Sequence, residues 1–193
     1  MKEHLSWWQE NINSNEGMAH FKLCCGNFKT PFKKYVREYI ENAGYKSVLD
    51  CGAGLCSEYF GFRNDGYEID YQAIDITPSL VEKHLAENIN IKEADIEKIP
   101  FGDDSVDVCI CHDVLNHQLD FRKSISEMTR VASKEVIISF FLEFCDKDKK
   151  EWRAPGLIYR YYNLKEMKDW LEKQELNYNF EDIHERKLLF IRC

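Results

Sequence analysis

The chain has 193 residues, 44% of them hydrophobic, and a formal net charge of −8 at pH 7. This length predicts one domain with a sizeable core, and the negative charge argues against nucleic acid or an anionic membrane surface as a partner. No run approaches the ~18 apolar residues of a membrane span, and the first residues do not begin a signal peptide.

Residues 1–29 are the least regular part of the chain, and we expect them to form an N-terminal helical cap or lid. One short helix is predicted over residues 5–12 and another over 18–25, with a polar break at 13–17 between them. Two interpretations remain open for this segment. It packs passively on the domain, or its aromatic side chains close over a ligand.

From residue 30 onward, predicted helices and strands alternate. Apolar residues at helical spacing, or a threonine-proline pair at the start, predict helices over residues 30–43, 55–62 and 77–88, with two more that begin at 120 and 163. Continuous apolar runs predict strands at 48–49, 71–76, 89–94, 106–111 and 135–141, and a closing pair at 176–183 and 187–191.

This alternation predicts an α/β fold in a single domain over residues 30–193. We expect a Rossmann-like, seven-stranded, mostly parallel sheet with helices on both faces and a C-terminal antiparallel strand pair. Ligands bind such sheets at the carboxyl ends of the strands. Residues 142–162 are polar and aromatic without clean periodicity, which is typical of an insertion.

The most distinctive stretch joins the first predicted strand to the next helix. It reads Asp50-Cys51-Gly52-Ala53-Gly54, a carboxylate followed by two glycines. Glycine lets a ligand approach the backbone, and the free N–H groups at a helix N-terminus favour an anionic group. Because Asp50 can take a cationic group close by, the turn is suited to a ligand that carries both charges.

The eight cysteines contain no pair at the spacing C-x-x-C. Several of them lie in apolar runs, where a reduced cysteine behaves as a small hydrophobic residue. The pattern therefore predicts reduced thiols, no metal site and a cytoplasmic protein.

A series of motifs now carries a resemblance. In chain order they are VLDCGAG at 48–54, the acidic Asp75 at the end of the second strand, Ala94-Asp95 after the third, IPFGDDSVDVCIC at 99–111 and VLNH at 114–117. This order resembles the class I S-adenosylmethionine-dependent methyltransferases, especially the small-molecule branch related to quinone biosynthesis. The chain departs from that pattern at Cys56, where the first motif often has a third glycine.

The resemblance implies S-adenosyl-L-methionine as the cofactor and S-adenosyl-L-homocysteine as its product. It implies that the glycine turn holds the methionine half, that Asp75 binds both ribose hydroxyls, and that Asp95 with Ile96 binds adenine. The implied cofactor-binding residues are Asp50, Gly52, Ala53, Gly54, Asp75, Ile76, Asp95, Ile96 and Cys111. Each acid has an alternative role as a residue that only structures its own turn.

The expected reaction is an in-line displacement at the sulfonium methyl group, to an oxygen or nitrogen atom of a small-molecule acceptor. Most of the catalysis can come from placing the acceptor atom close and aligned, and a base is needed only if that atom must lose a proton. His117 and His112 are the candidates for that base, since both follow the fourth strand. His117 has an alternative role in orienting the following helix.

Residues 142–162 are expected to form the acceptor side of the site. The candidate substrate-binding residues in this insertion are Trp152, Arg153, Arg160 and Tyr162. The arginines favour an anionic acceptor if they face it. They can also pair with surface carboxylates, in which case they carry no such meaning.

Two other functions fit parts of the pattern. A nicotinamide-dependent oxidoreductase also has a glycine-rich first turn and an acid that ends the second strand, although the first turn here lacks the third glycine of that fingerprint. A non-catalytic partner subunit that binds the cofactor is the second alternative. A subunit without catalytic activity would not need the acidic residues of these motifs. The chain has them, which favours an enzyme.

Overall fold

The computed structural model describes residues 3–12, 14, 18–19, 22 and 26–193. At the N-terminus, a turn of 3-10 helix, η1 (Glu3–Leu5), leads into the short helix α1 (Ser6–Asn11), where one helix was expected. The second helix predicted for this segment lies largely outside the described residues. None of the described helices has the length and apolar character needed to cross a membrane.

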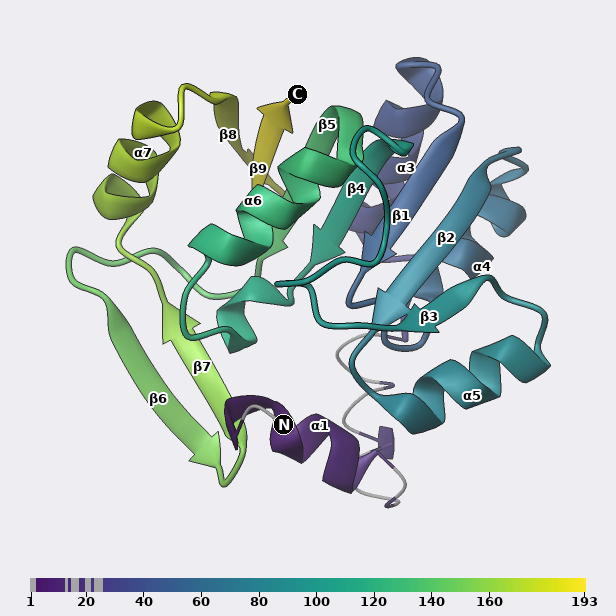
Figure 1. The fold of residues 1–193 in the computed structure, drawn as a ribbon, viewed down its shortest axis with the longest axis horizontal. Coiled ribbons are helices and arrows are strands. Elements are labelled where there is room, and N and C mark those ends of the chain that lie inside the picture. Colours follow the sequence, from purple (N-terminus) through teal and green to yellow (C-terminus); the bar gives the residue numbers. More distant parts are fainter. Residues whose placement is uncertain (1–2, 13, 15–17, 20–21, 23–25) are drawn as a thin grey trace.

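In the described part of the chain, a seven-stranded sheet forms the centre of the molecule, in the order β3-β2-β1-β4-β5-β9-β8 (Figure 1). Neighbouring strands are parallel from one edge to the middle: β1 (Ser47–Cys51), β2 (Asp70–Asp75), β3 (Ile91–Glu93), β4 (Val106–His112) and β5 (Ala132–Phe140). The closing antiparallel pair is β8 (Asn177–Ile183) and β9 (Arg186–Arg192). The predicted sheet is therefore confirmed, with strand ends that differ from the prediction by at most three residues.

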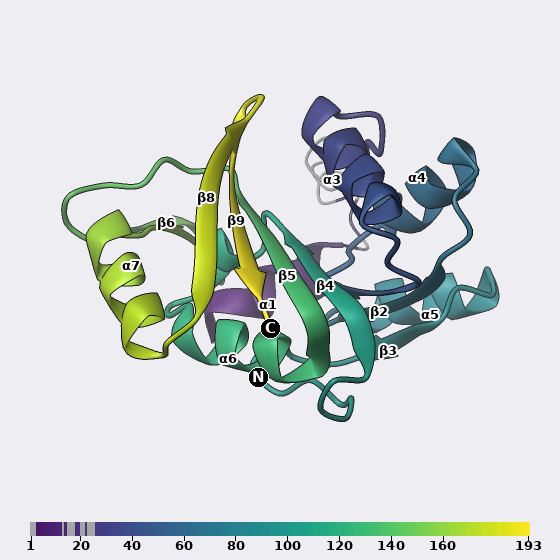
Figure 2. The same ribbon diagram turned by 90° about the horizontal axis from the view of Figure 1, so that it is seen from above.

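Helices cover both faces of the sheet (Figure 2). They are α3 (Pro31–Asn42), α4 (Ser57–Asp65), α5 (Pro78–Ala86), α6 (Arg122–Val131) and α7 (Leu164–Lys173). On one face, the apolar stripe of α3 packs Val36 and Ile40 into the core. On the other face, α6 contributes Ile125 and Met128. The side chain of Asn163 accepts the N–H of Glu166 at 2.9 Å, which fixes the start of α7.

The order of the strands decides where a ligand can bind. The chain first builds outward from β1 through β2 to β3, and then returns to the other side of β1 to form β4 and β5. The loops that follow β1 and β4 therefore leave the sheet in opposite directions and open a crevice at the carboxyl ends of these strands.

The insertion at residues 142–162 contains a feature that the sequence did not predict. It forms a separate antiparallel hairpin of β6 (Lys149–Ala154) and β7 (Leu157–Tyr161). The hairpin lies beside α1, where the N–H of Trp7 donates to the carbonyl of Gly156 at 3.2 Å (Figure 1). Two segments far apart in the sequence thus form one structural unit at the edge of the domain.

Helices α3 and α4 are joined by a buried cation. The guanidinium of Arg37, which is 1% exposed, binds Glu58 at 3.0 Å and Asp65 at 2.7 Å. Gly61 on α4 lets this side chain pass, because a Cβ at that position would lie 2.5 Å from a guanidinium nitrogen of Arg37.

We therefore predict that Gly61→Ala destabilises the protein, although alanine usually favours a helix over glycine. The two ion pairs prevent Arg37 from moving away, so the free energy of unfolding should fall by about 1–3 kcal/mol. Chemical denaturation measures the change. Gly102→Ala is the control, because a Cβ there meets no atom within 4 Å, and it should change stability by less than about 0.5 kcal/mol. Equal stability of both variants would contradict the prediction.

Candidate active site

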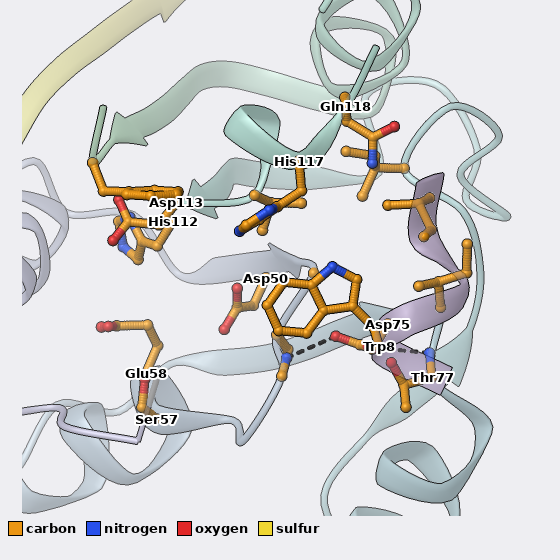
Figure 3. A pocket seen from close by; sticks show the side chains of 18 of the residues that line it. Trp8, Asp50, Ser57, Glu58, Asp75, Thr77, His112, Asp113, His117 and Gln118 are labelled. Atoms are coloured by element: carbon orange, nitrogen blue, oxygen red, sulfur yellow. Dashed lines mark hydrogen bonds between the residues drawn. The ribbon is translucent and has the colours of Figure 1, made fainter. Parts of the chain in front are cut away.

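A cavity of about 400 Å³ lies at the carboxyl ends of β1, β2 and β4 (Figure 3). This volume is in the range of small-molecule sites in proteins. Its floor comes from the turn after β1 and from the residues that follow β2, β3 and β4. Its remaining walls come from η1, α1, α3, the start of α4, η2 (Leu115–His117), β7 and the first residue of β9.

The glycine turn has a shape that requires glycine. Gly52 has φ of +81°, and a Cβ on it would lie 2.6 Å from the side chain of Val114 in the loop after β4. The N–H groups of Gly52 and Ala53 both donate to the carbonyl of Ile74, at 2.8 and 3.0 Å. The turn is therefore held flat against the sheet, and its bare backbone faces the cavity.

Asp75 connects this turn to the next helix. Its Oδ2 accepts the N–H of Gly54 and its Oδ1 accepts the N–H of Thr77, each at 2.8 Å. Burial raises the pKa of Asp75, and these hydrogen bonds oppose the rise. A carboxylate has about four acceptor positions, so this side chain can still accept hydrogen bonds from a ligand in the cavity.

Asp50 is buried under the same turn. The hydroxyl of Tyr71 donates to its Oδ2 at 2.7 Å. Burial raises the pKa of Asp50 to about 7; the bond from Tyr71 opposes this rise and the nearby carboxylate of Glu58 adds to it. A cationic group of a ligand would lower this pKa, because its charge stabilises the ionised form of the carboxyl group. Asp50 is therefore suited to bind such a group.

Lys33 on α3 places a cation in the same cavity, and the sequence analysis missed it. Its ammonium lies 2.6 Å from the hydroxyl of Ser57 and 3.7 Å from the carboxylate of Glu58, at the start of α4. Lys33 is 7% exposed and follows Phe32 on the apolar stripe of the helix. A lysine on a buried helix face was the signal in the sequence that could have identified it.

The structure brings nearly all the implied cofactor residues into this cavity. The lining includes Asp50, Gly52, Ala53, Gly54, Asp75, Ile76, Asp95 and Ile96. Cys111 is the exception: it lies in β4 with its side chain 0% exposed in the core, and it is not part of the lining. Alternation along β4 explains this, because the neighbouring His112 takes the orientation toward the cavity.

Both candidate histidines line the cavity, in different environments. His112 ends β4 with its ring edge-on to Phe32, and both of its ring nitrogens are buried without a hydrogen-bond partner among the described residues. Burial holds the pKa of His112 well below its usual value, with added effects from Lys33 and Arg186, among other cations, so the ring is neutral.

His117 ends η2 and is oriented by the backbone. Its Nδ1 lies 3.0 Å from the carbonyl oxygen of Ile158 in β7. A carbonyl oxygen only accepts, so Nδ1 carries the hydrogen and Nε2 holds the lone pair in the neutral ring. The ring packs against Trp8 with centroids 4.8 Å apart, and Figure 3 shows both side chains at the cavity.

The four residues expected to bind the acceptor do not line the cavity. Arg153 pairs with Glu151, Arg160 pairs with Asp148, Trp152 is half-exposed on β6, and Tyr162 is buried with its hydroxyl donating to the carbonyl of Leu115 at 2.8 Å. The physical reason is strand alternation, which turns Tyr159 toward the cavity and its neighbour Arg160 away from it. Neither insertion arginine is therefore placed to bind an anionic acceptor.

The comparisons with known proteins agree with this geometry. Residues 49–140 match the family model described as a methyltransferase domain. These residues, just under half of the chain, are similar to a methyltransferase domain, which supports a class I S-adenosylmethionine-dependent methyltransferase. It is 28% identical over 93 residues to the methyltransferase YcgJ of Bacillus subtilis, a match that covers 46% of this chain and 37% of that protein.

Solved structures of methyltransferases share the fold. One is a chain of the complex between the Haloferax volcanii Trm112 methyltransferase activator and a methyltransferase, with a TM-score of 0.70, 13% identity, and coverage of 100% of this chain and 98% of that one. Another is the Burkholderia thailandensis 1,6-didemethyltoxoflavin-N1-methyltransferase with bound 1,6-didemethyltoxoflavin and S-adenosylhomocysteine, with a TM-score of 0.63, 13% identity, and coverage of 97% and 84%.

The residues present in this methyltransferase fold fit the family's cofactor. The glycine turn lines the cavity with Gly52, Ala53 and Gly54, and acids and a lysine of opposite charge lie beside it. The methionine end of S-adenosylmethionine carries an ammonium and a carboxylate, which match Asp50 and Lys33 in charge.

The raised pKa of Asp50 predicts an effect of pH on stability. The folded protein keeps the Asp50 proton up to a pH of about 7, whereas the unfolded chain loses it near 3.8. The folded state therefore binds more protons between these values, and the free energy of unfolding should fall as pH rises through this window, by at most about 1.4 kcal/mol per pH unit.

Asp50→Asn removes this contribution and can still accept the bond from Tyr71. Urea unfolding at a series of pH values should show the wild type losing stability relative to the variant between about pH 4 and about pH 7. Acids distant from Asp50 contribute to both proteins equally, so the difference reports Asp50 together with its coupling to the nearby Glu58 and Asp75. A constant difference across the window would show that the folded and unfolded states bind this proton alike.

Proposed function

We propose that this chain transfers the methyl group of S-adenosylmethionine to an oxygen or nitrogen atom of a small-molecule acceptor. One observation carries the proposal: a single cavity joins the acids and glycine turn of the family to a wall that bears His117 and aromatic side chains. The resemblance to the quinone-biosynthesis branch also favours a small molecule over a polymer.

The cofactor side of the cavity has a role for each residue. Asp75 accepts the ribose hydroxyls, Asp95 and Ile96 hold the adenine, and Ile76 covers its other face. The glycine turn, Asp50 and Lys33 hold the methionine end. When bound, the cofactor supplies a methyl group on a positively charged sulfur, so the protein contributes chiefly by placing the acceptor in line with it.

His117 is the base in this proposal. Its Nδ1–H is fixed by the carbonyl of Ile158, so Nε2 is the nitrogen that takes a proton from the acceptor. His112 is neutral because it is buried, and the charges of Lys33 and Arg186 also disfavour protonation of its ring. We therefore assign it to hydrogen bonding rather than to proton removal.

The N-terminal segment acts as a cap over the site. Trp8 and Leu5 line the cavity, and the side-chain amide of Gln9 donates to the carbonyl of Ile76 at 2.8 Å. The bond from Trp7 to Gly156 attaches the same segment to the hairpin. A cap held at both ends excludes water from the reacting atoms.

The other readings have less support. The match to a methyltransferase model over residues 49–140 argues against a nicotinamide-dependent oxidoreductase. The retained acids and histidines argue against a subunit that only binds the cofactor. The Haloferax volcanii methyltransferase is in a complex with the Trm112 activator. We therefore also propose that this chain binds a protein partner.

A labelled methyl donor tests the function directly. The protein is incubated with S-adenosylmethionine carrying an isotopic methyl group and with fractions of small metabolites, and mass spectrometry identifies the molecule that gains the label. We expect a small acceptor with a new O-methyl or N-methyl group. Label found only on protein or nucleic acid would overturn the proposal, and so would its absence from every fraction.

Asp75→Asn should weaken binding of S-adenosylmethionine by about tenfold to about a hundredfold. The change removes a charge-assisted acceptor for the ribose hydroxyls, each such bond contributing about 1.5–3 kcal/mol. Calorimetric titration measures the dissociation constant. Asp70→Asn is the control, because this acid is exposed at the other end of β2, and it should leave the constant unchanged. An equal constant for Asp75→Asn and wild type would remove the assignment.

His117→Ala should lower kcat by about a hundredfold or more while the dissociation constant of the cofactor changes by less than about twofold. The variant lacks the proton acceptor but keeps the acids and the glycine turn. Steady-state kinetics with the acceptor found above, at saturation, measure the rate. His184→Ala, an exposed histidine between β8 and β9, is the matched control. Unchanged turnover in His117→Ala would show that the imidazole only orients η2.

A further inference from the structure

Four rings form one continuous surface inside the cavity. This aromatic wall consists of Trp8, His117, Phe141 and Tyr159, and each of the four lines the cavity. His117 is at its centre, with ring centroids 4.8 Å from Trp8 and 5.4 Å from both Phe141 and Tyr159. None of the four belongs to the residues assigned to the cofactor.

The rings come from four separate elements of the fold. Trp8 is on α1, His117 ends η2, Phe141 follows β5 and Tyr159 is on β7. Trp8 and Tyr159 lie outside the part of the chain that matches the methyltransferase model, and Phe141 lies directly after it. The wall is thus a feature that segments around the shared domain add to its carboxyl edge.

The angles between the rings suit a flat guest. Trp8 and His117 are inclined by 76°, His117 and Tyr159 by 65°, and Phe141 and Tyr159 by 82°. A planar aromatic molecule that stacks on one of these rings meets a neighbouring ring edge-on. Both arrangements are favourable between aromatic rings, and a saturated molecule of the same size gains neither.

The charges near the wall argue against an anionic guest. Arg186 is held by the carboxylate of Asp113, with its Nε 3.0 and 3.1 Å from the two oxygens. Lys33 lies beside Glu58. Arg186 is therefore paired, Lys33 is the cation assigned above to the carboxylate of the cofactor, and the insertion arginines lie outside the lining.

One polar group beside the aromatic wall, the side-chain oxygen of Gln118, lacks a hydrogen-bond donor in the described part of the chain. Gln118 follows His117, lines the cavity and is 2% exposed. Leaving a buried amide oxygen without a hydrogen-bond donor costs free energy. A ligand O–H or N–H that donates to this oxygen would remove that cost.

We propose that the acceptor is a flat, uncharged aromatic or heteroaromatic molecule with a hydroxyl or N–H group, held against the aromatic wall. The inference rests on the proposed function. The acceptor oxygen or nitrogen forms a bond to the methyl carbon, and the carbon–sulfur bond breaks with its electron pair left on sulfur. The acceptor proton goes to Nε2 of His117, and the products are the methylated ring compound and S-adenosylhomocysteine.

Binding of matched probes tests this without turnover. Calorimetry first measures the binding of S-adenosylhomocysteine to the full chain. Ligand-observed NMR then measures, with and without S-adenosylhomocysteine, the binding of three separate probes: naphthol, its saturated counterpart decahydronaphthol, and the anion naphthoate. We expect naphthol to bind about tenfold or more tightly than either of the others. Equal binding of naphthol and decahydronaphthol, tighter binding of naphthoate, or no binding of naphthol would overturn the inference.

Two variants locate the binding. Tyr159→Leu should weaken naphthol by about twofold to about tenfold, and Phe141→Leu should do the same if the first variant fails to fold. Tyr161→Leu, on the same strand but outside the lining, should bind like the wild type. Equal affinity in Tyr159→Leu and Tyr161→Leu would overturn the inference. Failure of S-adenosylhomocysteine to bind would instead count against the proposed function, since naphthol binding is read separately with and without it.

Discussion

The site depends on one buried carboxylate. Asp75 accepts the N–H groups of Gly54 and Thr77 at 2.8 Å each, and so fixes the turn after β1 against the start of α5. Without such donors, a carboxylate this deeply buried would have to take up a proton. Because the same side chain faces the cavity, the group that sets the shape of the turn also offers oxygen atoms to the ligand. Shape and recognition therefore depend on the same charge.

Other charges in the cavity follow the same principle. Lys33, Glu58 and Arg37 form a buried network at the start of α4, and Asp50 lies close by with a raised pKa. Taking charges out of water costs several kcal/mol per ion unless they are paired, and apolar residues would often be at least as stable. Perturbed carboxyl groups inside a cleft are typical of functional sites. We infer that this network binds a ligand that carries both a positive and a negative charge.

The two sides of the cavity have different origins. The part that matches the methyltransferase model contains the glycine turn, Asp75, Asp95, and the histidines at the end of β4 and in η2. The segments around it add α1 and the β6–β7 hairpin, which are bonded to each other through Trp7 and Gly156. The matched part supplies the glycine turn and the acids to the cavity, and the segments around it supply Trp8 and Tyr159.

The sequence by itself determined the order of the main strands and helices, the glycine turn, the acid that ends β2 and the acid that follows β3. Each of these leaves a local pattern, because a buried strand is a short apolar run and a helix start shows its proline or cap. It did not determine the hairpin, whose strands show no regular alternation of burial. Only the tertiary structure decided that Lys33 and Trp8 enter the cavity while Arg153, Arg160 and Cys111 do not. Which distant side chains meet depends on how whole elements pack, and no local pattern along the chain records that.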